Sequence, residues 1–323
     1  MAGDGYASER ELQVRKAFAD QANWCEKLGS PLTSALCVIL AERLDRTTEI
    51  GRRILDWPGD KPDAMGDSVP LRIAGGLHAL VRRGRLPGLA EFYPPNPLPD
   101  ATVFAAAIAA ALADAEADLM PWLDSAPQTN EVARSAQIYA GLLAIAAATA
   151  KPLALYELGA SGGLNLYCDR FAYRFAGRDF GLPGSAVQLA PDWNGAAPAP
   201  AEVNVVSRRG CDLNPFDLAE ASDRERLTAY VWADQGHRLD RLAAALAIAR
   251  AEPTRIEAAD AGKWLSAVAA APPEPGICRV VFHTIARQYF PEATERAVAA
   301  AIERLGATAT EEAPFAWLSF ENE

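Results

Sequence analysis

The stretch LALYELGASGGLNLY, residues 153–167, decides the fold of this chain. It runs from an apolar segment through Glu157 into a glycine-rich turn and then resumes an apolar pattern. A short apolar run that ends at glycines is typical of a buried strand, and glycines let the backbone turn sharply and approach a ligand. The stretch therefore predicts a strand that leads into a turn suited to a phosphate or a nucleoside.

Strand-like and helix-like segments alternate after this stretch as far as the C-terminus. Strands are predicted at residues 203–210, 254–258, 277–282 and 315–320, with helices between them from about residue 237, over 261–270 and over 291–305. Residues 171–175 alternate as a strand does, and residues 186–189 are a candidate hairpin partner for them. Strands that alternate with helices predict an α/β fold with a doubly wound, mostly parallel sheet.

The chain before this region has helical periodicity and no strand pattern. Val14, Phe18, Cys25 and Leu28 recur on one helix face, behind a Ser8 that forms a capping box with Glu11. We expect an all-helical N-terminal region over residues 1–149 and a Rossmann-like domain over residues 150–323.

Composition limits the partners of this chain. It has 323 residues, 50% of them apolar, a formal net charge of −11 and five cysteines without CxxC spacing. The negative charge disfavours nucleic acid, and the scattered cysteines argue against a disulfide framework or a zinc knuckle. The N-terminus lacks the apolar segment of a secretory signal, and we expect a cytoplasmic protein with no membrane span and no bound metal.

Candidate site residues follow the predicted strands, because ligands of such sheets bind beyond the carboxyl ends of the strands. These residues are expected to form one rim, and each also has a structural interpretation. On the structural interpretation, the glycine-rich turn is only a tight connection and Asp212 is a turn residue. Asp260 is then the N-cap of a helix, and His283 is a packed, hydrogen-bonded histidine rather than a general base. The set comprises Glu157, Gly159, Ser161, Gly162, Gly163, Asp212, Asp260 and His283.

The successive motifs ELGASGG, GCDLNP, EAADA and RVVFHT resemble those of class I S-adenosylmethionine-dependent methyltransferases. The resemblance covers residues 153–290 and implies a doubly wound sheet with S-adenosylmethionine along its strand ends. It assigns the methionine part of the cofactor to Glu157 and the turn 159–163, the ribose hydroxyls to Asp212 and the adenine amino group to Asp260. It places His283 and Thr284 beside the methyl acceptor. The whole chain also resembles an uncharacterised bacterial family of unknown function.

Two functions remain open at this point. The first is methyl transfer to an unidentified small molecule or protein, with His283 as the catalytic residue. The second is a non-catalytic scaffold of the same fold that binds a cofactor or another protein. A nicotinamide-dependent oxidoreductase is disfavoured, because Ser161 stands where a dinucleotide site needs a second glycine. No motif reports the acceptor or the oligomeric state.

Overall fold

The computed structural model describes residues 8–98 and 100–321, and the chain divides into two compact units. One unit combines Met1–Thr129 with Glu225–Leu239, and the other combines Asn130–Arg224 with Asp240–Glu323. The expected division at residues 149 and 150 stays a prediction about independent domains. The compact units show that the chain does not pass from one unit to the other at a single point.

The first unit contains a bundle of helices around one apolar core. The capping box at its start is confirmed, since the Ser8 hydroxyl accepts a 3.1 Å hydrogen bond from the Glu11 amide. Val14, Phe18 and Cys25 are buried, whereas Leu28 is 59% exposed because it ends the helix. The helices are α1 (Glu9–Lys27), α2 (Pro31–Arg43), α3 (Glu49–Leu55), α4 (Val69–Arg82), α5 (Pro87–Ala90), α6 (Ala101–Asp114), α7 (Glu116–Leu119) and η1 (Met120–Asp124).

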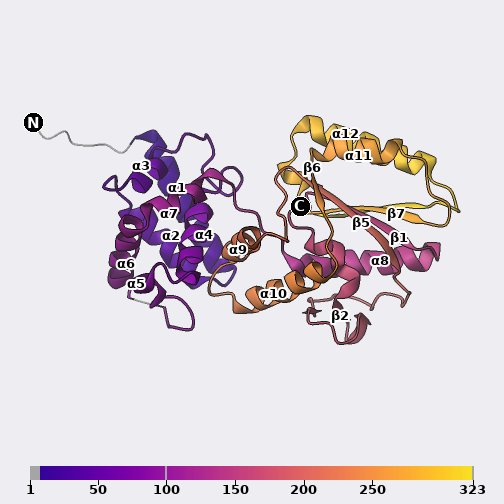
Figure 1. The fold of residues 1–323 in the computed structure, drawn as a ribbon, viewed down its shortest axis with the longest axis horizontal. Coiled ribbons are helices and arrows are strands. Elements are labelled where there is room, and N and C mark those ends of the chain that lie inside the picture. Colours follow the sequence, from indigo (N-terminus) through magenta and orange to yellow (C-terminus); the bar gives the residue numbers. More distant parts are fainter. Residues whose placement is uncertain (1–7, 99, 322–323) are drawn as a thin grey trace, which may run out of the picture. The chain divides into compact units, whose positions relative to one another are not determined.

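The second unit is built on a five-stranded, all-parallel sheet, which confirms the α/β fold class (Figure 1). Two helices, α9 and α10, include the points at which the chain passes between the units. The strands are β1 (Leu153–Leu158), β2 (Ala172–Phe175), β3 (Arg178–Gly181), β4 (Gln188–Leu189), β5 (Val205–Asp212), β6 (Ile256–Ala258), β7 (Cys278–Thr284) and β8 (Phe315–Phe320). The helices are η2 (Val132–Arg134), α8 (Ser135–Thr149), η3 (Leu164–Arg170), α9 (Ala221–Ala229), α10 (Gly236–Ala251), α11 (Ala261–Ala270), η4 (Arg287–Tyr289) and α12 (Glu292–Thr308).

The strand order of the large sheet is β6-β5-β1-β7-β8. The chain therefore builds outward from β1 through β5 to β6, and then returns to the other side of β1 with β7 and β8. This is the order of a Rossmann-like, doubly wound sheet, and its topological switch point lies between β1 and β7. The carboxyl ends of these two strands are the expected position of a ligand.

Helices cover both faces of this sheet (Figure 1). Leu158 and Val281 belong to an apolar cluster with α11 and α12 on one face. On the opposite face α8 packs closely on β8, where a Cβ added to Gly141 would lie 2.8 Å from the Leu318 side chain. Neighbouring residues in a strand point to opposite faces, so the sheet register fixes the face of every side chain at its carboxyl edge.

A small second sheet, in the order β3-β2-β4, corrects one expectation. Residues 186–189 are not the hairpin partner of β2, because β4 pairs with β2 in parallel. The antiparallel partner is β3, which follows β2 through Ala176 and Gly177, both with positive φ. Two successive residues of positive φ define a tight hairpin turn.

Two strands of the large sheet extend further than the sequence predicted. Asp212 and His283 are not beyond their strands, because Asp212 pairs with Ala258 and His283 pairs with Ser319 in the parallel ladder. Both residues therefore have a fixed side-chain direction, and neither lies on a free loop.

Candidate functional site

The glycine-rich turn lies at the switch point, and three of its residues have left-handed backbone conformations. The φ angles of Gly159, Ser161 and Gly163 are +66°, +54° and +73°. A Cβ added to Gly159 would lie 2.6 Å from the Ala286 Cβ, so glycine is required where the turn passes the segment after β7. Serine pays a steric cost for the same conformation, and such residues concentrate at functional sites.

Backbone amides of the turn are bonded within the protein. Ala160 donates to the Cys211 carbonyl at 3.0 Å and Gly163 to the Ala160 carbonyl at 2.7 Å. Ser161 donates to Asp212 Oδ2 and Leu164 to Asn130 Oδ1, both at 2.9 Å. A phosphate-binding turn instead directs its amides at the ligand. The geometry therefore favours a ligand that is recognised by the side chains around the turn.

Glu157 is the buried acid of this site. Its side chain lies at the end of β1 with only 1% of the residue exposed. Among the described residues Oε2 has no hydrogen-bond partner, although the Asn165 amide bonds to the carboxyl group. Burial raises the pKa of Glu157 well above its usual value, the Asp212 charge adds to that effect, and Asn165 and Arg134 oppose it. An unpartnered, buried carboxyl oxygen is costly and marks a position where a ligand donor fits.

Asp212 joins two loops at the carboxyl edge. Its Oδ2 accepts the Ser161 amide and its Oδ1 accepts the Asn214 amide, both at 2.9 Å. The Phe216 amide also donates to the Ser161 carbonyl. Asp212 therefore ends β5, and its side chain holds the turns that follow β1 and β5.

Asp260 is the N-cap of α11. Its Oδ1 accepts the Lys263 amide at 2.9 Å and its Oδ2 accepts the Thr294 hydroxyl at 2.5 Å. The hydrogen bond from Thr294 is the largest effect that lowers the pKa of Asp260. This carboxylate thus links the start of α11 to α12.

We expect Asp260→Ala to lower the free energy of unfolding by about 1–2 kcal/mol, because the cap is lost. Asp260→Asn keeps an oxygen that accepts the Lys263 amide and is expected to cost less. Because folding lowers this pKa, the stabilisation is present above about pH 4, the usual range of an aspartate, and is lost as the pH falls through the lowered value. Urea unfolding of both variants at neutral and acidic pH measures these losses in the free energy of unfolding. Equal losses in the two variants at neutral pH would contradict the capping role.

His283 is 1% exposed and both of its ring nitrogens have partners. Nδ1 lies 2.6 Å from Glu321 Oε1, and Nε2 accepts a 3.1 Å hydrogen bond from the Trp317 indole. Glu321 Oε1 also accepts the backbone amides of Ala286 and Arg287. The arrangement is that of a neutral histidine with its proton on Nδ1 and its remaining lone pair in use.

Glu157 and His283 point to opposite faces of the sheet. His283 is in register with Leu158, so its side chain points to the face that α11 and α12 cover. Glu157 is in register with Phe282 and points to the opposite face. Both residues lie at the carboxyl edge, where alternate residues of a strand face opposite ways, and a shared rim stays a prediction.

Residues outside the predicted motifs complete the Glu157 side of the site. Arg134 donates to the Thr284 carbonyl at 3.1 Å, Asn130 holds the start of η3, and Asn165 bonds to Glu157. Ile285 follows β7 with a φ of +49°, which is unusual for a β-branched residue. Only Asn165 had a sequence signal, as a polar residue within the apolar run LNLY.

Comparison with protein families gives one match, to a family described as "Uncharacterized protein conserved in bacteria (DUF2332)", over residues 15–323. The chain belongs to this family. No curated protein and no solved structure matches the chain. The family description names no activity, so the functional argument depends on the geometry of the site.

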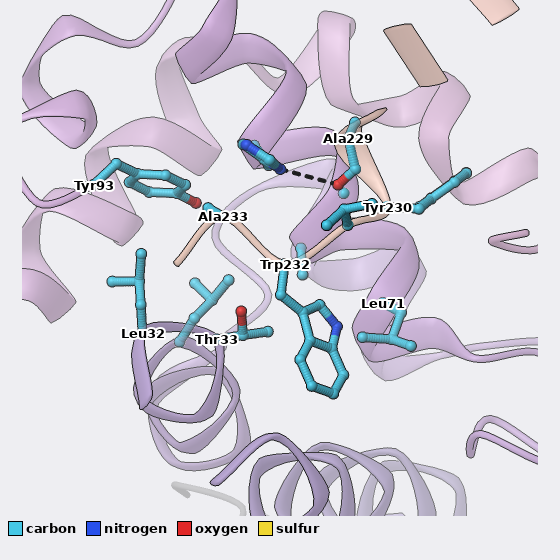
Figure 2. A pocket seen from close by; sticks show the side chains of 13 residues that line it. Leu32, Thr33, Leu71, Tyr93, Ala229, Tyr230, Trp232 and Ala233 are labelled. Carbon is cyan, nitrogen blue, oxygen red and sulfur yellow. Dashed lines mark hydrogen bonds between the residues drawn. The ribbon is translucent and has the colours of Figure 1, made fainter. Parts of the chain in front are cut away.

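The helical unit contains a small cavity (Figure 2). It has room for about one water molecule, and Tyr93 and Trp232 reach into it. His78 Nδ1 lies 3.1 Å from the Ala229 carbonyl, and burial lowers the pKa of His78 to about 4. Nearby, Asp234 accepts the Leu32 amide at the start of α2. The segment 229–235 therefore closes and anchors this part of the helical unit.

One segment of the described chain, Val132–Thr149, is long and apolar enough to cross a membrane by length and composition alone. It forms η2 and α8, whose buried residues include Ile138, Leu142 and Leu143. Within the protein, 44% of this segment is buried. The described residues contain no group of three or more His, Cys, Asp or Glu side chains that could hold a metal ion.

Proposed function

We propose that the protein is an S-adenosylmethionine-dependent methyltransferase with its cofactor at the switch point of the sheet. The observation that carries this proposal is the buried, unpartnered Oε2 of Glu157 at the carboxyl end of β1. The strand order and the resemblance of the strand-end motifs support the same position for the ligand.

The residues present fit this cofactor. A carboxyl oxygen without a donor suits the ammonium group of the methionine part. Asp212, at the end of the neighbouring strand β5, would accept the ribose hydroxyls. Asp260 would accept the adenine amino group beside its capping bonds. The turn 159–163 would contact the ligand through its closely packed backbone, since most of its amide donors are already bonded.

S-adenosylmethionine supplies an electrophilic methyl group on its sulfonium, and the chain would contribute binding and orientation. Glu157 and Asp260 would fix the two ends of the cofactor, and Asp212 would hold the ribose between them. His283 would act as a base only if Trp317 released Nε2, because a base needs a free lone pair. We place the acceptor, a small molecule or a protein, on the side of Thr284, and the reaction in the cytoplasm.

The engaged nitrogens of His283 favour a second function, a scaffold that binds the cofactor without turning it over. Both functions require the same cofactor site and differ only in methyl transfer. A nicotinamide cofactor is less compatible, because the amides that a pyrophosphate needs are bonded to Cys211, Asp212 and Asn130.

Calorimetry and thermal unfolding with S-adenosylmethionine, S-adenosylhomocysteine, NAD and ATP test the proposal. We expect the first two to bind and stabilise the protein by about 2.7 kcal/mol at a concentration of 100 times Kd, and the others not to bind. Asp212→Ala is expected to weaken binding at least about tenfold, since hydrogen bonds to a charged group contribute about 1.5–3 kcal/mol. Asp217→Ala, an exposed acid in the same loop, is the matched control.

Binding of NAD or ATP alone would overturn the proposal, as would no binding of S-adenosylmethionine or its demethylated product. Binding without detectable methyl transfer to any acceptor would favour the scaffold. Equal effects of Asp212→Ala and Asp217→Ala would remove Asp212 from the site.

A further inference from the structure

Glu157 is a carboxyl group buried without a dedicated counter-ion. The residue is 1% exposed, no salt bridge to it is present among the described residues, and one oxygen lacks a partner. A carboxylate in such surroundings loses its hydration without recovering it from the protein. The protonated, neutral acid is the form that burial favours.

The groups that face Glu157 do not reverse this preference. From η3 come the neutral Asn165 amide and Cys168, and burial raises the pKa of the Cys168 thiol well above its usual value. From β5 comes Asp212, a negative charge, and from η2 comes Arg134, a positive charge that also donates to the Thr284 carbonyl. Its register partners on the neighbouring strands, Gly210 and Phe282, carry no charge. One charge of each sign leaves burial as the largest effect on the pKa of Glu157.

We propose that Glu157 carries a proton in the ligand-free protein and releases it to solvent when a ligand ammonium group takes the position beside Oε2. This inference rests on the proposed function. In the exchange the carboxyl O–H bond breaks, the proton passes to water or buffer, and the carboxylate pairs with the ammonium. No covalent bond to the ligand forms, and the proton released balances the positive charge bound.

The exchange has two measurable consequences. Ligand affinity rises with pH, by up to about tenfold per pH unit, as long as the pH is below the pKa of Glu157 in the free protein. The ligand-free protein also loses stability as the pH rises above about 4.3, the usual value of a glutamate, because the folded state holds a proton that the unfolded chain gives up.

The ligand-free protein provides the first test. We expect the urea midpoint of Glu157→Gln to rise relative to that of the unaltered protein as the pH increases from 5 to 8, because glutamine cannot ionise. Glu321→Gln is the matched control, since Glu321 is a second acid at this edge with a buried, unpartnered oxygen. Burial would raise the pKa of Glu321, but hydrogen bonds from His283, Ala286 and Arg287 lower it. The difference in urea midpoint between Glu321→Gln and the unaltered protein should therefore change at acidic pH. A difference in urea midpoint between Glu157→Gln and the unaltered protein that stays constant from pH 5 to 8 would overturn the inference.

The second test is calorimetry with S-adenosylmethionine and S-adenosylhomocysteine, which share the ammonium group, in phosphate and in Tris at pH 7. The two buffers differ in ionisation enthalpy, so the difference in binding enthalpy counts the protons released. We expect release of up to one proton by the unaltered protein and none by Glu157→Gln. Binding without proton release overturns the exchange and leaves the proposed function standing. No binding of either ligand overturns both.

Discussion

Gly159→Ala is expected to lower the free energy of unfolding by about 2–4 kcal/mol and to abolish detectable binding of S-adenosylmethionine. A left-handed conformation costs an L-residue about 1–2 kcal/mol, and forcing an extra methyl group into a packed site costs about 1–3 kcal/mol. Both apply at φ +66° with a Cβ only 2.6 Å from that of Ala286. Ala286 cannot yield easily, because its amide donates to Glu321.

Gly184→Ala is the matched control for this prediction. Gly184 has a φ of +75°, and nothing lies within 4 Å of the added Cβ. Gly184→Ala should therefore lower the free energy of unfolding only by the cost of the left-handed backbone conformation, and it should leave ligand binding unchanged. Urea unfolding and calorimetry of both variants make the comparison. Equal losses of stability would mean that the close approach of the turn to Ala286 carries no cost.

Asp169→Ala is expected to lower the free energy of unfolding by about 3–5 kcal/mol, the largest effect on stability among these variants. Arg208 Nη2 lies 2.7 and 2.6 Å from the two Asp169 carboxylate oxygens, and the two side chains are 7% and 10% exposed. Arg208 also donates to the Leu166 carbonyl at 3.0 Å. Removing the acid leaves a buried guanidinium without its main counter-charge.

The matched control is Asp179→Ala. Asp179 pairs with Arg174 at 2.8 Å on the surface, where the Arg174 and Asp179 side chains are 60% and 74% exposed. Solvent screens such a pair, so it contributes little to stability. The combined variant Asp169→Leu, Arg208→Met should recover much of the loss, because it removes both charges together. An effect of Asp169→Ala as small as that of Asp179→Ala in urea unfolding would contradict the prediction.

The sequence predicted the central strands well because their apolar runs are short and bounded by turn residues. PLALYEL contains β1 and ICRVVF covers most of β7, and the alternation with helices predicted the parallel sheet. The predicted partner of β2 was wrong. The tight turn after β2 has an alanine at positive φ, and it lacks the Asn-Gly pair by which such turns are recognised in a sequence. Strand ends were placed two residues early at β5 and β7, because ladder pairing continues into polar residues.

The candidate site was predicted in part. Sequence order brought Glu157 and the turn to the correct edge, but it could not assign the face of His283, which depends on the sheet register. It offered N-capping as one interpretation of Asp260, which the Lys263 hydrogen bond confirms. Asn130 precedes η2 and Arg134 ends it, and both lie outside every strand motif. Only the tertiary structure could therefore bring Asn130 to the start of η3 and Arg134 to Glu157.

The inclusion of Glu225–Leu239 in the helical unit affects how the protein can be made. During synthesis the first helices emerge long before the segment that supplies Asp234 to the start of α2 and Trp232 to the cavity. The early helices are therefore incompletely packed while the part of the chain that forms β1 and β5 is translated. A fragment that stops before residue 225 would lack part of the apolar interior of this unit, and a dissection of the protein needs to retain both segments.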